Sequence, residues 1–578
     1  MTSQLHPKDT ARPRARSWWI AAPLLVSVGL FAERAFRIAL ERYYSIDEFQ
    51  YAHAGWLVSR GAVPYRDFFQ HYMPLLYQSL AVPFLFLDSD PTAMRALRVV
   101  AFPIVLWIAY SCYRINSSSD GGWAILAPLF LLSVNAFVTR AVELRPDGYA
   151  TALFFSAIAL LSGGKPASRR RAVLAGALAG ASFLASQKAL YYCLAFVVAF
   201  AIDAASNRRR RRFLLGDPAG FVAGAAAVLF AFAIFLTVTG AWPGWVEHAV
   251  RWSIYHQRHY YGFPFARTLF PVFFENRLLF FLALIGLAVS FRRMFAAGVA
   301  GANPEDVLPV LALGSTFASF ALTRAPHVYC LVPFFPALCV FSARGAVALG
   351  RRSFTGRAAP VLRIALALVL ASELVQAYRR LDVATMNRND YQQATLARVA
   401  ALTREDEPVF DNAGAAVARP HVLFHYYGDR LHLELRAKEL ETRAPEGMLR
   451  TGCVLVLYER RFVVLPPKLL AFISENYQPY DGDLRLWGRR YRTEGRPMKD
   501  QFYAIRDGRY FVSPASALDA GKLLIDGRPV LSPTFALTRG MKSVEYSGSE
   551  RQIYLLWLPA NGIRYAPRPG LPPRFLTL

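Results

Sequence analysis

The chain has 578 residues, of which 54% are hydrophobic, 14% aromatic and only 18% charged, yet its formal net charge is +26. A soluble globular protein has nearer a quarter charged residues, and a disordered or nucleic-acid-binding chain is less apolar. The positive excess is unevenly placed, because residues 1–375 carry +18 and residues 376–578 carry +8. An apolar half with most of the positive charge fits a membrane protein with basic cytoplasmic loops, and it fits a DNA-binding protein poorly.

Apolar stretches run through the first 377 residues, and about eleven of them are long enough, or nearly so, to cross roughly 30 Å of hydrocarbon. The first begins at Trp18 and has no small-residue cleavage site before Glu33, which predicts an uncleaved first span rather than a signal peptide. The predicted spans lie near 18–40, 94–113, 123–139, 148–163, 172–187, 189–203, 213–240, 277–291, 307–322, 329–346 and 358–377.

The basic residues of this half support one orientation. With the N-terminus in the cytoplasm, every strongly basic cluster falls in a predicted cytoplasmic loop, as the positive-inside rule requires. An odd number of spans then places residues 378–578 on the other side, in the periplasm or its equivalent, which predicts a multi-pass membrane protein with an extracytoplasmic tail. The clusters are Arg12/Arg14/Arg16, Arg114, Lys165 with Arg169-Arg170-Arg171, Arg208 to Arg212, Arg292-Arg293, and Arg351/Arg352/Arg357.

Two predicted outer loops are long. Residues 41–93 mix charge with short apolar helical stretches broken by Pro74 and Pro83, which favours helices lying along the membrane surface. Residues 241–276 are rich in Trp, Tyr, His and Arg, including Arg251, and an aromatic interface belt explains many of them.

The tail predicts a second domain of α/β to β-rich type. Residues 391–402 read as an amphipathic helix, and the apolar runs at 409–410 and 453–458 read as short buried strands. After Gln501, short alternating runs separated by Asp-Gly and Pro favour antiparallel strands. We therefore divide the chain into a membrane domain, 1–377, and a tail domain, 378–578.

The cysteines give no sign of a metal site. Only Cys453 lies in the tail, and neither a CxxC pair nor a Cys/His ligand spacing occurs. We predict no cofactor and no metal ligand, and leave a divalent cation open.

Charged residues at the predicted outer ends of spans need an explanation, because they oppose the inside bias of the other charges. Asp47 and Glu48 suit the first turn of a helix, Asp147 follows Arg145 and Pro146 at a helix start, and Lys188 stands alone at an outer turn. Each has a structural explanation as a helix-capping or snorkelling residue. The last group, Arg324, His327 and Tyr329, opens the tenth span.

Gathered at one membrane face, these groups suit the transfer of a sugar from a lipid phosphate. A carboxylate takes the proton of the acceptor hydroxyl, and Arg and Lys hold the phosphate leaving group. A transporter places its charges near mid-membrane beside interrupted helices. The outer clustering therefore favours an interfacial enzyme.

The chain resembles class C integral-membrane glycosyltransferases over about residues 41–340. Within that family it is most similar to the glycosyltransferase family 39-like group, with the protein mannosyltransferases and the lipid A aminoarabinose transferases. The motifs that carry the resemblance, in chain order, are residues 47–51, 61–69, 71–75, 93–98, 145–147, and 327–329 with Pro333 and Pro336.

The resemblance implies an inverting transfer from a polyprenyl-phosphate sugar to a lipid, polysaccharide or protein acceptor of the cell envelope. It implies that Asp47 is the general base, that Glu48 supports it, and that Asp147 is a second site carboxylate. The side chains that would meet the donor phosphate or sugar are Lys188, Arg324, His327, Tyr329, Arg145, His71 and Arg251. A membrane lipid is a further partner, and no nucleic acid is expected.

Two other functions remain open from the sequence. The protein would be a flippase for a lipid-linked saccharide if the charged groups only escort the substrate. It would be an envelope scaffold if the tail alone bound polysaccharide.

Overall fold

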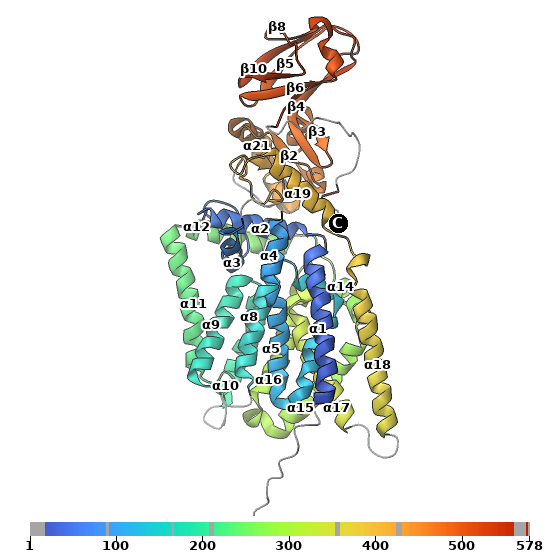
Figure 1. The fold of residues 1–578 in the computed structure, drawn as a ribbon. Coiled ribbons are helices and arrows are strands. Elements are labelled where there is room, and N and C mark those ends of the chain that lie inside the picture. Colours follow the sequence, from blue (N-terminus) through green and yellow to red (C-terminus); the bar gives the residue numbers. More distant parts are fainter. Residues whose placement is uncertain are drawn as a thin grey trace, which may run out of the picture.

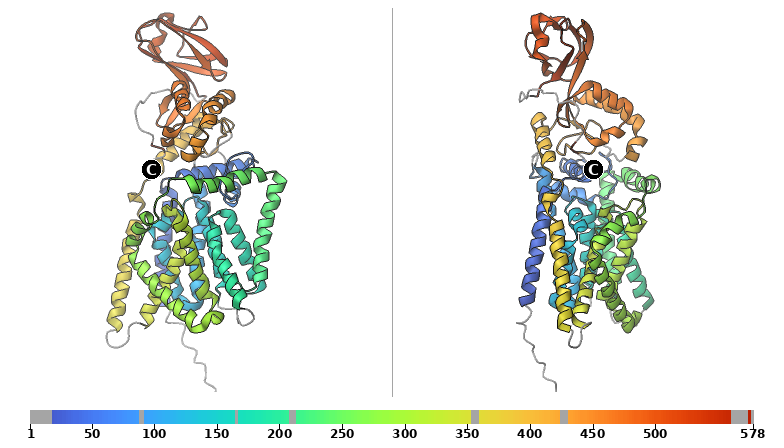
Figure 2. Two further views of the ribbon diagram at one scale, coloured as in Figure 1. Left: turned by 180° about the vertical axis from the view of Figure 1, so that it is seen from behind. Right: turned by 90° about the vertical axis from the view of Figure 1, so that its right-hand side faces the viewer.

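The computed structural model describes residues 18–87, 92–163, 167–206, 213–352, 359–423, 430–559 and 574–575. Helices stand side by side in its first half, and the tail rises from one end of this bundle (Figures 1 and 2). The basic residues predicted at Arg12/Arg14/Arg16, Lys165, Arg208 to Arg212 and Arg357 lie outside the described residues.

Each predicted span coincides with helical structure. Within the described part of the chain, five segments are long and apolar enough by themselves to cross a membrane, namely Ala93–Ser133, Pro218–Thr239, Arg277–Gly298, Pro304–Leu322 and Ala359–Arg380. The chain is therefore a multi-pass membrane protein. The helices of the bundle are α1 (Trp18–Glu41), α4 (Ala93–Ala101), α5 (Pro103–Asp120), α6 (Leu126–Ser133), α7 (Asn135–Ala141), α8 (Pro146–Leu161), α9 (Arg169–Ala185), α10 (Ala189–Ser206), α11 (Pro218–Thr239), α15 (Arg277–Gly301), α16 (Pro304–Leu322), α17 (Phe334–Arg352) and α18 (Ala359–Arg380).

Glycines allow the closest helix pairs to touch through their backbones. A side chain at Gly176 or Gly224 would collide with the facing backbone where α9 meets α11, and Gly286 and Gly345 do the same where α15 meets α17. In lipid, helices are not driven together by the hydrophobic effect. Small residues at these crossings let the backbones come close, so that van der Waals packing holds the helices together.

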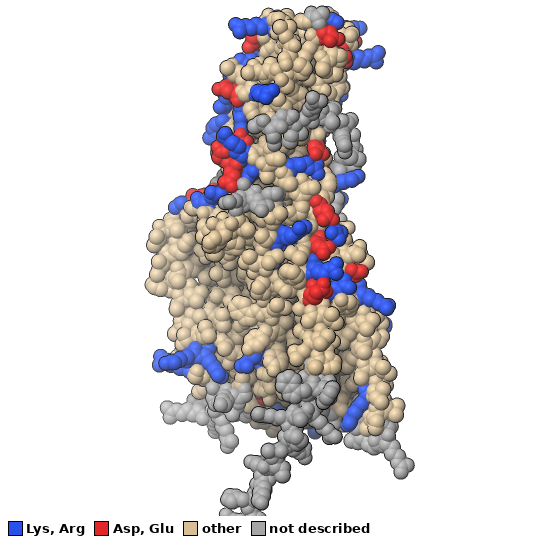
Figure 3. Space-filling view, in the orientation of Figure 1, with Lys and Arg blue, Asp and Glu red and all other residues tan. Residues whose placement is uncertain are grey.

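Charge divides the molecule along its long axis. Lys and Arg gather at the lower rim in Figure 3, a band with few charges follows, and both signs mix around the tail. The end of the bundle that carries the tail also carries the predicted outer loops (Figure 1). Hydropathy thus predicted the helical bundle.

Short helices lie across this outer end. The first predicted outer loop forms α2 (Ile46–Ser59) and α3 (Leu75–Phe84), and the second forms α12 (Trp242–Trp245), a π-helix (Val246–Arg251), α13 (Trp252–His259) and α14 (Ala266–Glu275). Helix α2 starts with a capping box, in which the Ser45 backbone N–H donates to the Glu48 carboxylate at 2.9 Å. This cap fixes the first turn of α2, where Asp47 lies.

The tail is β-rich, as predicted, with two sheets. The first has the order β1-β2-β4-β11-β6-β9, with β3 paired to β4, and the second has the order β5-β10-β7-β8. Among these pairings β1–β2 is parallel and the others are antiparallel. The strands are β1 (Val409–Phe410), β2 (Leu455–Leu457), β3 (Tyr477–Asp481), β4 (Leu484–Arg492), β5 (Met498–Ala504), β6 (Gly508–Ser513), β7 (Leu523–Ile525), β8 (Arg528–Pro529), β9 (Thr534–Leu537), β10 (Gly540–Tyr546) and β11 (Gln552–Trp557), and the helices are α19 (Asp390–Leu402), α20 (Arg430–Leu435), α21 (Ala437–Thr451) and α22 (Pro467–Asn476).

The tail packs directly on the outer loops. Tyr44 and Gln392 bond reciprocally, since the Tyr44 N–H donates to the Gln392 side-chain oxygen at 2.8 Å and the Gln392 amide donates to the Tyr44 carbonyl at 3.0 Å. On α2, the buried His53 ring donates from Nδ1 to the Val417 carbonyl at 2.8 Å. Apolar side chains of α2, β1 and β2 share one buried cluster, so the tail and the helix that carries Asp47 form a continuous structure.

Candidate functional site

Asp47 and Arg145 meet at the outer end of the bundle. Arg145 is the last residue before α8, and its Nη1 donates to Asp47 Oδ2 at 2.6 Å. The Arg145 side chain is 4% exposed, whereas the Asp47 side chain is 30% exposed. Asp47 is therefore a carboxylate held on one side by a guanidinium and accessible on the other.

Two cations, Arg145 and Lys188, lie close to the ring of Tyr329. The Arg145 guanidinium lies 3.7 Å from the ring centroid and the Lys188 ammonium lies 4.8 Å from it. Cations this close to an aromatic face are attracted by its quadrupole. Lys188 also donates to Asp147 Oδ1 at 3.1 Å, and Asp147 Oδ2 lies 3.9 Å from Arg145 Nε. Asp47, Arg145, Asp147, Lys188 and Tyr329, predicted as site residues from four separate segments, thus form one group.

Glu143 extends this network with two further arginines. Arg42 Nη1 and Arg140 Nη1 donate to Glu143 Oε1 at 2.7 Å and 2.8 Å. The connected cluster, which we call the outer charge cluster, has one more cation than it has carboxylates. Its members are Arg42, Asp47, Arg140, Glu143, Arg145, Asp147 and Lys188. The single excess positive charge matches a phosphodiester anion.

Glu48 points away from this cluster although it follows Asp47 directly. Its carboxylate is fully buried and forms a bidentate pair with Arg98, with Nε–Oε1 and Nη2–Oε2 distances of 2.7 Å and 2.6 Å. It also accepts from the backbone N–H of Leu144 at 3.0 Å. Glu48 thereby ties α2, α4 and the turn before α8 together.

The ionisable groups of the loops are held in their charged forms. Burial alone would raise the pKa of Asp47, but Arg145, Arg461 and His71 act against it, and the net pKa lies below the ordinary value for aspartate. Burial alone would lower the pKa of Arg145 and Lys188, but Asp47 and Asp147 respectively outweigh it, and both pKa values are raised. The site therefore holds an ionised carboxylate beside two permanent cations.

For the sugar transfer that the sequence predicts, we expect kcat/KM for the donor to keep its value down to about pH 5, because kcat/KM reports the ionisation of the free enzyme and Asp47 stays charged below its usual pKa. The measurement is a pH profile of initial rates at low donor concentration. Replacing His71 and His327 by glutamine removes the nearby imidazoles. An acid limb near pH 6 that survives in this variant would contradict an ionised Asp47.

The other predicted site residues lie at or beyond the edge of the cluster. The His327 ring is stacked on Tyr329, with 5.4 Å between centroids, and burial lowers the pKa of this histidine, with Arg145 acting in the same direction. The His71 ring packs against Tyr72 at 4.1 Å, and its charge also influences Asp47. Both histidines border the cluster.

Arg324 and Arg251 are not part of the outer charge cluster. Arg324 donates to the carbonyls of Arg258 and Tyr260 at 2.5 Å and 2.6 Å, where it closes the end of α13. A cation there complements the helix dipole. Arg251 is 73% exposed and pairs with Glu247 one turn away.

Three residues of the site were not predicted from the sequence. Arg98 was noted only as a motif position, Cys330 lies 3.7 Å from Lys188, and Arg461 of the tail acts electrostatically on Asp47. No sequence signal points to Arg461, because its approach depends on how the tail packs. Among the described residues, no group of three or more His, Cys, Asp or Glu side chains is arranged to hold a metal ion.

The fold is that of class C glycosyltransferases. ArnT from Cupriavidus metallidurans in the apo state superposes with a TM-score of 0.55 at 13% identity, covering 82% of this chain and 98% of that chain. The same protein bound to undecaprenyl phosphate superposes with a TM-score of 0.50 at 13% identity, covering 91% and 98%. No protein-family model matches the chain, and no curated protein sequence matches it. At the level of fold, the predicted resemblance is confirmed.

Proposed function

We propose that the protein is an inverting glycosyltransferase that moves a sugar from a polyprenyl-phosphate donor to an acceptor of the bacterial cell envelope. The observation that carries the proposal is the partly exposed Asp47 carboxylate beside the Arg145 and Lys188 cations. This transfer requires a base for the acceptor hydroxyl beside cations that bind the donor phosphate. The likeness in fold to ArnT, which binds undecaprenyl phosphate, agrees with it.

In this reaction the acceptor oxygen attacks the anomeric carbon from the face opposite the phosphate. The bond between that carbon and the phosphate oxygen breaks, its electron pair leaves with the polyprenyl phosphate, and Asp47 takes the acceptor proton. Arg145 and Lys188 stabilise the charge that develops on the phosphate. The phosphate is a weakly basic leaving group, so no general acid is needed.

Arg145 links donor binding to the strength of the base. Without donor it forms a 2.6 Å hydrogen bond with Asp47, which lowers the pKa of that carboxyl. A donor phosphate that also binds the Arg145 guanidinium weakens the hydrogen bond between Arg145 and Asp47, so the pKa of Asp47 rises towards its ordinary value. Donor binding then makes Asp47 a better base.

The orientation of the chain follows from the same proposal. The polar outer end and the tail, 378–578, face the periplasm, and the basic rim of the membrane domain, 1–377, faces the cytoplasm of a bacterial inner membrane. The tail covers the helix that bears Asp47, which places it beside an arriving acceptor. No divalent cation is required in this scheme.

Release of free polyprenyl phosphate from a lipid-linked sugar tests the proposal. Wild-type protein in vesicles with a bacterial envelope extract is expected to release it. Lys188→Met is expected to weaken donor binding by about tenfold, because one charged hydrogen bond to phosphate is lost. Lys499→Met serves as the control that keeps full binding, because Lys499 is a 76% exposed lysine of the tail that pairs with Glu545. An intact donor moved across the bilayer would instead identify a flippase.

A further inference from the structure

A buried carboxyl group where the tail meets the outer loops has no part in the transfer proposed above. Glu459 lies two residues after β2 and is 0% exposed. Its Oε2 accepts from the Arg461 backbone N–H at 2.8 Å, whereas its Oε1 is shielded from solvent and has no hydrogen-bond partner among the described residues. A carboxylate that has lost its water and gained one neutral donor is costly in its ionised form.

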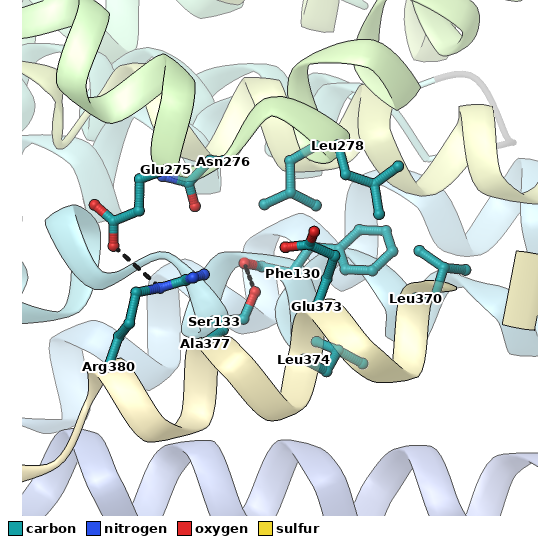
Figure 4. Close-up of a pocket in the computed structure, with 11 residues that line it drawn as sticks. Phe130, Ser133, Glu275, Asn276, Leu278, Leu370, Glu373, Leu374, Ala377 and Arg380 are labelled. Carbon is teal, nitrogen blue, oxygen red and sulfur yellow. Dashed lines mark hydrogen bonds and ion pairs between the residues drawn. The ribbon is translucent and has the colours of Figure 1, made fainter. Parts of the chain in front are cut away.

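Two other carboxylates in shielded places show what Glu459 lacks. Glu48 is paired with the Arg98 guanidinium at 2.6 Å. Figure 4 shows the same type of pair beside α18, where the half-buried Glu275 and Arg380 approach each other to 3.3 Å. Within the described part of the chain, Glu459 has no such ion pair. The charge of its ionised form is therefore not compensated by a contacting cation.

Glu459 lies on the side of the tail that faces α2. Leu455 and Leu457 of β2 belong to the buried cluster that contains Phe49 of α2, whereas Val456 belongs to the inner core of the tail. The backbone at Glu459 is still extended, with φ −116° and ψ 170°. Side chains alternate along an extended chain, so Glu459 points to the same side as Leu457, towards α2.

The loop after β1 joins this part of the tail to α2. Because β1 and β2 are parallel neighbours, the loop that follows β1 lies beside Glu459. In this loop the Gly414 backbone, with φ +70°, approaches His53 of α2 so closely that a Cβ on Gly414 would lie 2.8 Å from the His53 Cβ. A change of charge at Glu459 thus occurs next to a tight contact between the tail and α2.

Two further carboxyl groups flank Glu459 within the tail. Asp411 accepts from three backbone N–H groups of its own loop, at 2.8 Å, 2.8 Å and 3.1 Å. Asp483 accepts from the backbone N–H groups of Arg574 and Phe575 at 2.9 Å and 2.6 Å. The charged and titratable groups of the surrounding segments are Arg460 and Arg461 beside Glu459 itself, Asp411 and His421 of the loop after β1, His53 of α2, Tyr391 of α19, Asp483 and Arg485 where β4 begins, and Arg574.

Glu459 changes its charge near neutral pH. Burial raises the pKa of Glu459 to about 7, and the two flanking carboxyl groups act in the same direction, while Arg461 acts against them. Burial also raises the pKa of Asp483, although its two backbone donors oppose this rise. The two histidines stay neutral in this range, because burial lowers the pKa of His53 and lowers the pKa of His421 to about 3.

We propose that Glu459 is a pH switch for the docking of the tail on α2. When Glu459 is protonated, the tail packs on α2; when it ionises, it draws water to the junction, and the tail separates more often from the helix that carries Asp47. Protonation favours the docked state, and this stabilisation is complete below the ordinary glutamate pKa of about 4.3 and is lost as pH rises through about 7. The switch rests on the proposed function only for its consequence, slower sugar transfer at alkaline pH, because docking itself needs no substrate.

Hydrogen exchange of the full-length protein in detergent micelles, without donor or acceptor, tests the switch at pH 6 and pH 8. After correction for intrinsic exchange, peptides from α2 and from the loop after β1 are expected to open about tenfold more often at pH 8, because the docked Glu459 goes from about nine-tenths to about one-tenth protonated. Glu459→Gln keeps an oxygen for the Arg461 N–H but does not ionise, so it is expected to remove the difference. Glu475→Gln is the matched control and should keep it, because Glu475 is a 57% exposed carboxylate of the tail that pairs with Arg489.

Exchange in the β5–β10 pair reports whether the tail itself stays folded. These strands lie in the second sheet and are expected to exchange equally at both pH values. Equal opening of the wild-type junction at pH 6 and pH 8 would overturn the switch. So would a difference that survives in Glu459→Gln, or one that extends to β5–β10, which would mean unfolding of the tail. A tenfold difference without sugar transfer at either pH would support the switch and contradict the proposed function.

Discussion

Asp47→Asn is expected to lower the turnover of sugar transfer by about 10²–10⁴-fold, the range that general bases contribute. Asparagine keeps the size of the side chain but does not accept the acceptor proton. Donor affinity is expected to hold or rise, because the 2.6 Å partner of Arg145 loses its negative charge and competes less with the phosphate. Single-turnover rates and donor binding, measured separately, distinguish these effects.

Asp67→Asn is the matched control for this substitution. Asp67 lies in the same outer loop and pairs with Arg66 at 2.9 Å, and both side chains are well exposed. Exposed ion pairs contribute little to stability, so turnover should remain near the wild-type value. An Asp47→Asn protein that kept half of its turnover would remove Asp47 from the role of base and favour a carrier.

Much of the fold was predictable because two one-dimensional signals govern membrane insertion. Apolar length marks the spans, and the sidedness of arginine orients them. The same signals draw attention to Arg145 and Lys188, since a cation at an outer end of a span runs against the excess of Lys and Arg in cytoplasmic loops. The order of spans and loops along the sequence was therefore enough to predict that Asp47, Arg145, Asp147 and Lys188 lie at the same end of the bundle.

Pairing within the site was not predictable from the sequence. Adjacent residues of a helix point about 100° apart, so Asp47 reaches Arg145 while Glu48 reaches Arg98, 50 residues along the chain. Arg324 illustrates the same limit. Its position at an outer end suggests a phosphate ligand, which stays a prediction. Its guanidinium also closes the end of α13, and only the packing of that loop reveals this contact.

The fully buried Glu48–Arg98 pair leads to a prediction about stability. Arg98→Met leaves the Glu48 carboxylate buried without its partner, and it also removes donors from the carbonyls of Ala39, Arg42 and Tyr43. Breaking such a pair costs about 3–5 kcal/mol. The variant is expected to melt at a clearly lower temperature in detergent micelles. Arg60→Met is the control, because Arg60 directly follows α2 and pairs with Glu405 at the protein surface, so its loss should have little effect on stability.

The double variant Arg98→Met with Glu48→Leu distinguishes a role of Glu48 in stability from a role in catalysis. Removing both charges should recover part of the lost stability, since the desolvated carboxylate is gone. Recovery stays incomplete, because the N–H groups of Ser45 and Leu144 lose their acceptor. If Glu48 supports Asp47 only by stabilising the fold, turnover should recover together with the melting temperature. Recovered stability with abolished turnover would instead show that turnover needs the Glu48 carboxylate itself, through the cap that it gives the first turn of α2 or through the chemistry.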